Sequence, residues 1–371
     1  MAGVILPDAR SWPYTAGTID PGYIWPFPSF DFRVSLFVFL LLFCSEVGSS
    51  YFVQSVKMSI SKTVFKLNTG AEIPALGLGT WQSGPGEVTR AVYHALKVGY
   101  RHIDAAQCYG NEAEVGEGIK RALSENLVKR SEIFVTTKLW CTYHTRVEEA
   151  LNTSLSKLGL DYIDLYLMHW PLAMNPEGNH DLFPKLADGS RDIVHSHSHV
   201  TTWKNLEDVA ARFPEKVKAI GVSNYSKRYL EELLPQAKVV PAVNQIENHP
   251  ALPQQEIVDL CKEKGILITA YSPLGSTGSP LFTAEPIVEV AKRKGVPPAI
   301  VLLSWHLARG SSVLAKSVTP SRIEENMNLV KLDQEDLDLI AKYSDDLVAN
   351  KKWQRYVYPP FGVDFGFPDK S

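Results

Sequence analysis

Side chains that can exchange protons follow short apolar runs at regular places along this chain. Asp104, Lys138 and His169 each come at the end of such a run, and carboxylate, ammonium and imidazole groups are the types that serve acid–base chemistry. A single such residue could merely cap a strand, but a polar residue after so many successive runs favours a shared site. The same position is held further along by Ser223, Asn224, Gln245, Tyr271 and Lys316.

The apolar runs themselves predict β-strands. Amphipathic helical patterns lie between them, and in residues 145–158 Val147, Leu151 and Leu155 form one face, while Thr145 and Glu148 predict a capping box. Strands alternating with helices favour a closed (β/α)8 barrel, a TIM barrel, which we expect to carry an N-terminal β-hairpin. Active sites of such barrels lie at the carboxyl ends of the strands, here expected at residues 76–78, 102–103, 133–137, 162–168, 219–222, 242–244, 267–270 and 312–315.

An open, doubly wound parallel sheet is the competing fold. It would hold a dinucleotide through a Gly-x-Gly-x-x-Gly turn between its first strand and helix. Residues 77–82 are Gly-Leu-Gly-Thr-Trp-Gln, so the third glycine is missing and no helix is predicted to begin there. The barrel is therefore preferred.

The composition is that of an ordinary globular protein. The 371 residues are 45% hydrophobic and 21% charged, which is enough to build a full core. A formal net charge of −3 without a basic run argues against a nucleic-acid partner. The cysteines are far apart and form no zinc-type spacing with histidine, so we expect no metal site and a reducing, cytoplasmic location; they are Cys44, Cys108, Cys141 and Cys261.

Residues 1–57 differ in character from the rest of the chain. They include an apolar run at residues 34–44, shorter than the roughly 20 residues of a transmembrane helix but of a length found in signal peptides. The segment before this run lacks the short, positive start of a secretory signal. We expect a disordered or mis-assigned start at 1–57, with a signal or anchor for the secretory route as the alternative. Residues 58–371 would form the barrel, without a membrane partner.

Several longer motifs resemble one known family. They are residues 99–104 (GYRHID), 109–112 (YGNE) and 167–171 (LMHWP), followed by Lys316-Ser317, Arg322 and Glu325-Asn326. Together they resemble the aldo-keto reductase superfamily over about residues 65–353. Residues 137–141, 244–247 and 271–276 resemble the fungal NADP-dependent glycerol dehydrogenases and glyceraldehyde reductases in particular. The resemblance implies NADPH-dependent reduction of small aldehydes and ketones, such as glyceraldehyde and short sugar aldehydes, reversible as glycerol or polyol oxidation.

By this resemblance, Asp104, Tyr109, Lys138 and His169 form a catalytic tetrad. Hydride delivery to a carbonyl carbon leaves an alkoxide, which Tyr109 would protonate. Since a phenol with a pKa of about 10 is a weak acid at neutral pH, Lys138 is expected to lower the pKa of Tyr109 by stabilising the phenolate. Asp104 would keep Lys138 charged, and His169 would hydrogen-bond the substrate oxygen.

The resemblance also implies which residues hold NADPH or NADP+. Ser223, Asn224 and Gln245 would bind the nicotinamide carboxamide, and Tyr271 would stack on the nicotinamide ring. The further cofactor-binding positions implied are Ser272, Leu274, Ser317, Glu325 and Asn326, the last two near the adenine.

A positive region is predicted for the phosphate of the cofactor. Thr319 and Pro320 form a good helix start, with Thr319 as N-cap and Pro320 as the first helical residue. The amino end of that helix and the cations Lys316 and Arg322 would favour a 2′-phosphate, and hence NADPH over NADH.

Three tryptophans, Trp81, Trp140 and Trp170, each follow a predicted strand. They predict an aromatic wall around a small carbonyl substrate, with buried core tryptophans as the alternative. In this family the substrate is selected by loops, here about residues 172–200, 275–282 and the tail after 351. We expect a monomeric enzyme; the alternative function is a non-catalytic regulatory barrel that binds NADPH.

Overall fold

The computed structural model of the chain describes residues 62–276 and 278–370, so the predictions for residues 1–57 lie outside the described residues. Eight parallel strands close into a barrel in the order β10-β3-β4-β5-β6-β7-β8-β9, which confirms the predicted (β/α)8 fold. The strands are β3 (Leu76–Gly79), β4 (His102–Asp104), β5 (Phe134–Leu139), β6 (Leu165–Met168), β7 (Ile220–Ser223), β8 (Val243–Glu247), β9 (Leu267–Tyr271) and β10 (Ser312–Lys316).

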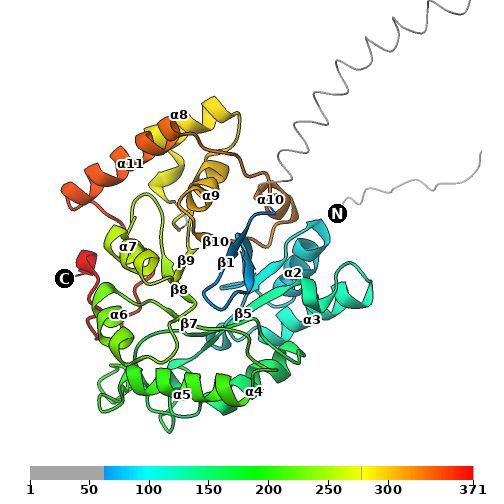
Figure 1. Cartoon of the computed structure of the whole chain (residues 1–371), viewed down its shortest axis with the longest axis vertical. Helices are drawn as coiled ribbons and strands as arrows, with labels where there is room; N and C mark the ends of the chain where they lie inside the picture. Colours follow the sequence, from blue (N-terminus) through cyan, green and yellow to red (C-terminus); the bar gives the residue numbers. More distant parts are fainter. Residues whose placement is uncertain (1–61, 277, 371) are drawn as a thin grey trace, which may run out of the picture. The chain divides into compact units, whose positions relative to one another are not determined.

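Helices surround the barrel strands, as Figure 1 shows. In α2, for example, Val88, Val92 and Leu96 are buried in the main apolar cluster with strand residues. Helices α8 and α11 instead pack with α9 in a second apolar cluster. The helices are α2 (Glu87–Val98), α3 (Glu112–Ser124), α4 (Val147–Leu158), α5 (His199–Arg212), α6 (Lys227–Leu233), α7 (Gln255–Glu263), α8 (Glu285–Lys294), α9 (Pro298–Ala308), α10 (Pro320–Glu325) and α11 (Gln334–Ala349), with 3-10 turns η1 (Gln107–Tyr109), η2 (Arg130–Glu132), η3 (Cys141–Tyr143), η4 (Leu234–Gln236), η5 (Pro280–Phe282) and η6 (Pro368–Lys370).

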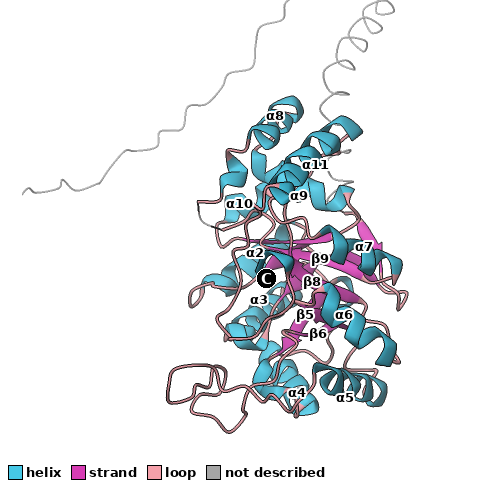
Figure 2. Ribbon diagram, turned by 90° about the vertical axis from the view of Figure 1, so that its left-hand side faces the viewer, coloured by secondary structure: helices cyan, strands magenta, loops and turns pink. Residues whose placement is uncertain are grey.

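Long loops lie at one end of the strands, and Figure 2 shows them in pink beside the helices. They include residues 172–198, between β6 and α5, and the tail that follows α11. The first loop follows the carboxyl end of β6, and the tail bonds Glu247 at the carboxyl end of β8, so both segments lie at the carboxyl ends of the strands. Within the described part of the chain, no helix is long and apolar enough to cross a membrane.

The predicted N-terminal hairpin is present as the antiparallel pair β1 (Val64–Lys66) and β2 (Glu72–Pro74). Its Ile73 is fully buried and belongs to an apolar cluster with Phe134, Leu165 and Val243, residues near the amino ends of three barrel strands. In the turn of the hairpin, Asn68 Nδ2 donates to the carbonyls of Val240 and Pro241 just before β8. The hairpin therefore closes the end of the barrel opposite the loops.

Gly77 lies inside β3, in agreement with the rejection of a phosphate-binding turn at residues 77–82. A Cβ atom at Gly77 would come 2.7 Å from His102 Nδ1 and 2.7 Å from Leu314 Cδ2. Packing inside the barrel, rather than contact with a ligand, therefore requires glycine there.

Two local predictions were wrong. Helix α4 begins at Val147, and no side chain among the described residues caps it, so Thr145 and Glu148 do not form a capping box. The 3-10 turn η3 extends into a turn through Thr145, which delays the helix start. Strand β6 begins at Leu165 rather than at 162, because the Asp164 carboxylate turns to accept hydrogen bonds from Arg130 and from the Val135 amide.

Replacing Ile73 by alanine should lower the free energy of unfolding by about 2–4 kcal/mol, because the change leaves a cavity in the apolar cluster under the barrel. Urea denaturation followed by circular dichroism measures this. The control is Val64→Ala on the neighbouring strand, where the side chain is 45% exposed. Equal losses for the two variants would contradict a packed hairpin.

Candidate active site

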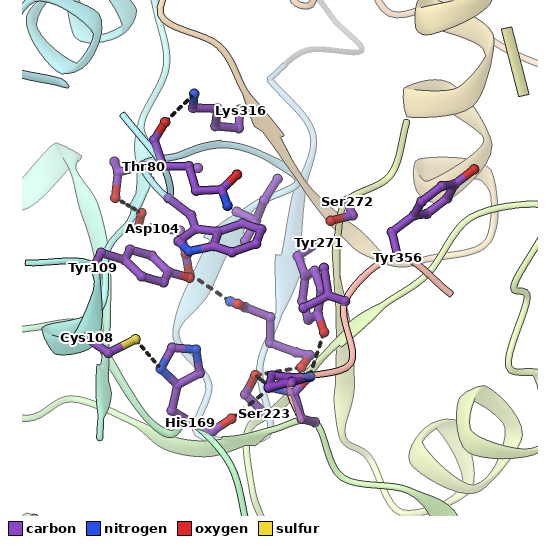
Figure 3. A pocket seen from close by; sticks show the side chains of 18 of the residues that line it. Thr80, Asp104, Cys108, Tyr109, His169, Ser223, Tyr271, Ser272, Lys316 and Tyr356 are labelled. Carbon is purple, nitrogen blue, oxygen red and sulfur yellow. Dashed lines mark hydrogen bonds between the residues drawn. The ribbon is translucent and has the colours of Figure 1, made fainter. Parts of the chain in front are cut away.

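A cavity of about 690 Å³ opens at the carboxyl ends of the barrel strands. Figure 3 shows side chains from several strands and loops converging on it. Its polar lining includes Asp104, Tyr109 and His169 on one side and Ser223, Gln245 and Tyr271 on another. Residues more than 160 positions apart in the sequence thus line the same cavity, because the carboxyl ends of all strands lie together in a closed barrel.

An ion pair lies at the base of this cavity. Lys138 Nζ donates to Asp104 Oδ1 at 2.6 Å, to the Ala105 carbonyl at 2.9 Å and to Tyr109 Oη at 3.1 Å. Lys138 is fully buried and Asp104 is 2% exposed. From the opposite wall, Gln245 Nε2 donates to the other Asp104 oxygen at 2.7 Å. Both carboxylate oxygens and all three ammonium protons are therefore matched by partners.

The pKa of Tyr109 is raised well above its ordinary value, first by burial and then by the Asp104 carboxylate. The expectation that Lys138 lowers this pKa was therefore wrong for the resting site. The physical reason is that burial disfavours the charged phenolate and that Asp104, paired with Lys138 at 2.6 Å, adds a negative charge that opposes its formation. Tyr109 thus holds its proton at neutral pH.

His169 follows β6 directly and is 7% exposed. Burial, with a smaller contribution from the Lys138 charge, holds the pKa of His169 well below its usual range, so the imidazole is neutral. Its Nδ1 lies 3.4 Å from Cys108 Sγ, a contact drawn in Figure 3. Burial raises the pKa of the Cys108 thiol, which can donate its proton to Nδ1. In that arrangement Nε2 carries the ring proton and can donate to an oxygen in the cavity.

The residues predicted to hold the nicotinamide come together on the cavity wall. Asn224 Nδ2 donates to the His169 carbonyl at 2.8 Å and to Ser223 Oγ at 3.1 Å, and Tyr271 Oη donates to Asn224 Oδ1 at 2.7 Å. Asn224 and Ser272 have positive φ angles of 62° and 48°, a strained conformation that clusters at ligand sites. The wall also includes Ser223, Gln245, Ser272 and Leu274.

The predicted phosphate and adenine positions lie at the far end of this wall. Lys316 lines the cavity and donates to the Gln82 carbonyl at 3.0 Å, while Arg322 is exposed on α10. Neither cation forms an ion pair with a carboxylate among residues 62–276 and 278–370. Thr319 is the N-cap position of α10 and Pro320 its first residue, as predicted, but the Thr319 side chain forms no capping hydrogen bond and this helix has only 6 residues. The lining of the cavity does not include Ser317, Arg322, Glu325 or Asn326.

The three predicted tryptophans all line the cavity. Trp81 is 41% exposed, whereas Trp140 and Trp170 are nearly buried. The Trp140 ring lies 5.2 Å from the His169 ring, centroid to centroid. Trp140 and Trp170 thus form a wall beside His169.

The structure adds lining residues that the sequence did not single out, among them Cys108, Phe183, Arg191, Tyr356 and Phe361. Phe183 and Phe361 extend the aromatic wall, since their ring centroids lie 5.2 and 6.4 Å from that of Trp140. Cys108 directly precedes the predicted Tyr109, and this neighbour is the one feature of the sequence that pointed to Cys108 as a lining residue. The others come from the long loop and the tail, where no strand pattern marks a position.

The tail is fastened across the cavity by a buried carboxylate. Glu247, at the end of β8, is fully buried and accepts the backbone N–H groups of Tyr356 at 2.6 Å and Val357 at 2.7 Å. Tyr356 Oη in turn donates to Ser279 Oγ at 3.1 Å, which joins the tail to the loop after β9. Arg355 pairs with Asp369 at 2.7 Å within the tail itself. Charge-assisted hydrogen bonds thus fix this wall of the cavity.

Comparisons with known proteins agree with the predicted resemblance. Residues 75–345 match the Aldo/keto reductase family. The chain is 64% identical over 309 residues to D-galacturonate reductase from Hypocrea jecorina, covering 83% of this chain and 99% of that protein. It is 47% identical over 313 residues to glycerol 2-dehydrogenase (NADP(+)) from Saccharomyces cerevisiae, covering 82% and 97%.

A solved structure, that of the aldose reductase from Schistosoma japonicum, superposes with a TM-score of 0.71 at 40% identity, over 76% of this chain and 91% of that one. The relatives carry the names of reductases and dehydrogenases, so the expectation of an oxidoreductase is confirmed and the alternative of a non-catalytic regulatory barrel is dropped. With its barrel, its cavity and these matches taken together, the chain belongs to the aldo/keto reductase family of enzymes.

Proposed function

We propose that this enzyme reduces small aldehydes, including sugar aldehydes, to alcohols with NADPH, and that Tyr109 is the general acid. The observation that carries the proposal is the position of Lys138 Nζ, which contacts both the Asp104 carboxylate and the Tyr109 hydroxyl at the base of an aromatic cavity. The reverse reaction would oxidise glycerol or another polyol with NADP+.

The tetrad would carry out the proton transfer that accompanies hydride transfer. NADPH, when bound, supplies the hydride that reaches the carbonyl carbon. Tyr109 donates its proton to the carbonyl oxygen, which is consistent with the raised pKa that keeps the phenol protonated. As negative charge moves onto Tyr109 Oη, Lys138 stabilises it from 3.1 Å. His169 donates from Nε2 to the same carbonyl oxygen and orients it.

The wall around Asn224 fits the cofactor. Ser223, Asn224 and Gln245 would bind the carboxamide, and the Tyr271 ring would stack on the nicotinamide; these side chains lie together on the cavity wall. Ser272 and Leu274 continue this wall toward the dinucleotide. Lys316 and Arg322 would bind the 2′-phosphate, which their lack of carboxylate partners within the described residues supports. The remaining contacts would come from Ser317, Glu325 and Asn326.

The aromatic wall of Trp81, Trp140 and Trp170 would enclose the substrate. Reductases of D-galacturonate and dehydrogenases of glycerol among the relatives support short sugar aldehydes as the substrate class. The enzyme would work as a monomer. A reducing, cytoplasmic compartment is supported by the free thiols of Cys108, Cys141 and Cys261.

Replacing Tyr109 by phenylalanine should lower kcat for D-glyceraldehyde by about 100- to 10,000-fold, because the proton donor is removed. NADPH affinity should stay within about twofold, since the phenol is not among the cofactor-binding groups. Stopped-flow turnover and fluorescence titration with NADPH measure the two effects. The control is Tyr93→Phe, a tyrosine on α2 whose hydroxyl bonds Glu125 outside the cavity. Retention of more than about a tenth of the turnover would refute the assigned role.

Replacing Lys316 by methionine should raise the Kd for NADPH by about 10- to 100-fold and leave that for NADH nearly unchanged, because only NADPH carries the 2′-phosphate. Titration of both cofactors measures this selectivity. Lys342→Met, at an exposed position of α11, should change neither constant. An equal loss of NADPH and NADH binding would argue against a 2′-phosphate contact.

The pH profile should reflect both shifted groups. Since the pKa of His169 lies well below 6.5, reduction of glyceraldehyde should show no histidine step near neutral pH. Since the pKa of Tyr109 is raised, the acid form persists at neutral pH, and kcat/KM should fall only at alkaline pH, as the phenol loses its proton. Initial rates across the pH range check this. A fall in kcat/KM with a midpoint below about pH 8 would contradict the protonated phenol.

A further inference from the structure

We propose that Arg191 binds a carboxylate at the far end of the substrate, so that the preferred substrates are aldehyde sugars that carry a terminal acid group. The inference rests on the proposed reductase function and assigns a residue to the choice of substrate. It concerns the loop of residues 172–198, in which the sequence indicated no specific site.

Arg191 lies in this loop and lines the cavity. The loop is held by a short antiparallel bridge between Lys185 and Arg191, and Arg191 Nη1 donates to the Phe183 carbonyl at 2.9 Å. The guanidinium carbon also lies 5.2 Å from the centre of the Phe183 ring. These contacts use one of the five N–H donors and hold the guanidinium in place, which leaves donors for a ligand.

A continuous row of rings connects Arg191 to the reaction centre. Phe183 lies 5.2 Å from Trp140, and Trp140 lies 5.2 Å from His169, measured between ring centroids. An aldehyde held by Tyr109 and His169 would extend along this row. The group that reaches Arg191 is therefore at the end of the substrate remote from the carbonyl.

Electrostatics favours an anion at that end. Of the cavity-lining residues in the described chain, Asp104, Arg191 and Lys316 carry a formal charge. Asp104 is neutralised by Lys138, and Lys316 bonds the Gln82 carbonyl at the end assigned to the cofactor. Arg191 forms no ion pair with a carboxylate within residues 62–276 and 278–370, and the adjacent Asp192 instead accepts a hydrogen bond from Asn175 Nδ2 at 2.8 Å.

The geometry of the guanidinium selects a carboxylate in particular. Its planar pair of N–H groups matches the two oxygens of a carboxylate, and such charge-assisted, bidentate contacts are among the strongest hydrogen bonds in proteins. A single cation among aromatic rings suits a single negative charge better than a phosphate dianion. Acidic sugars such as hexuronates combine an aldehyde at one end with a carboxylate at the other.

The test compares Arg191→Gln with the wild-type enzyme on D-galacturonate, D-glyceraldehyde and D-glucose 6-phosphate, with NADPH. The ratio of kcat/KM for galacturonate to that for glyceraldehyde should fall by about 10- to 100-fold, mainly through KM, because only galacturonate loses an ionic contact. Arg191→Lys should recover part of the ratio. Lys185→Gln removes the same charge from the exposed partner in the bridge and should leave the ratio unchanged.

Binding gives a second readout. D-Gluconate, an acid sugar without an aldehyde, should quench the fluorescence of the cavity tryptophans in the wild-type enzyme and bind at least about 10-fold more weakly to Arg191→Gln. An unchanged ratio, equal losses on both aldehydes, or a larger loss on glucose 6-phosphate than on galacturonate would overturn the inference. If the wild-type enzyme reduced none of these aldehydes, the proposed function would be overturned instead. The gluconate titration would still decide whether Arg191 binds a carboxylate.

Discussion

The buried ion pair between Lys138 and Asp104 is the interaction around which the cavity is organised. Removing two charges from water costs several kcal/mol per ion, and their attraction offsets this only if the remaining hydrogen-bonding groups are satisfied. Here the Ala105 carbonyl, Gln245 and Tyr109 supply those partners. Ala105 and Tyr109 follow β4, whereas Gln245 comes from β8, so the full set of partners forms only when distant parts of the barrel come together. The fold and the reaction centre therefore depend on each other.

The pair also reinforces the protonation states that burial gives its neighbours. Burial raises the pKa of Tyr109, and the Asp104 carboxylate raises it further, so the phenol keeps its proton. Burial lowers the pKa of His169, and the Lys138 charge lowers it further, so the imidazole stays neutral. A protonated phenol and a neutral imidazole are both hydrogen-bond donors toward one point in the cavity. A carbonyl oxygen, which gains negative charge during reduction, matches two such donors. The two donors thus suit the negative charge that develops on the carbonyl oxygen during the reaction, rather than an anion bound beforehand.

The sequence predicted the barrel and the residues at its strand ends well, because both follow from local patterns. A buried parallel strand is an apolar run, and the polar residue after it is visible at positions such as Asp104 and His169. The failures have tertiary causes. The direction in which the pKa of Tyr109 shifts depends on its burial and on the nearby Asp104 carboxylate, and the start of α4 depends on the turn before it. Arg191 and Phe361 lie in segments without periodicity, so only the folded chain brings them to the cavity.

Gln245 and Glu247 stand two residues apart on β8, with their side chains on the same face of the strand. One contacts the carboxylate at the base of the cavity, and the other holds the tail that forms its outer wall. The distance between base and wall therefore corresponds to two residues of strand, about 7 Å, and is fixed by the rigid backbone. This strand therefore keeps a constant spacing between the two sites. Different side chains on the tail can select molecules of different shape, while the depth at which the reacting end is held stays constant.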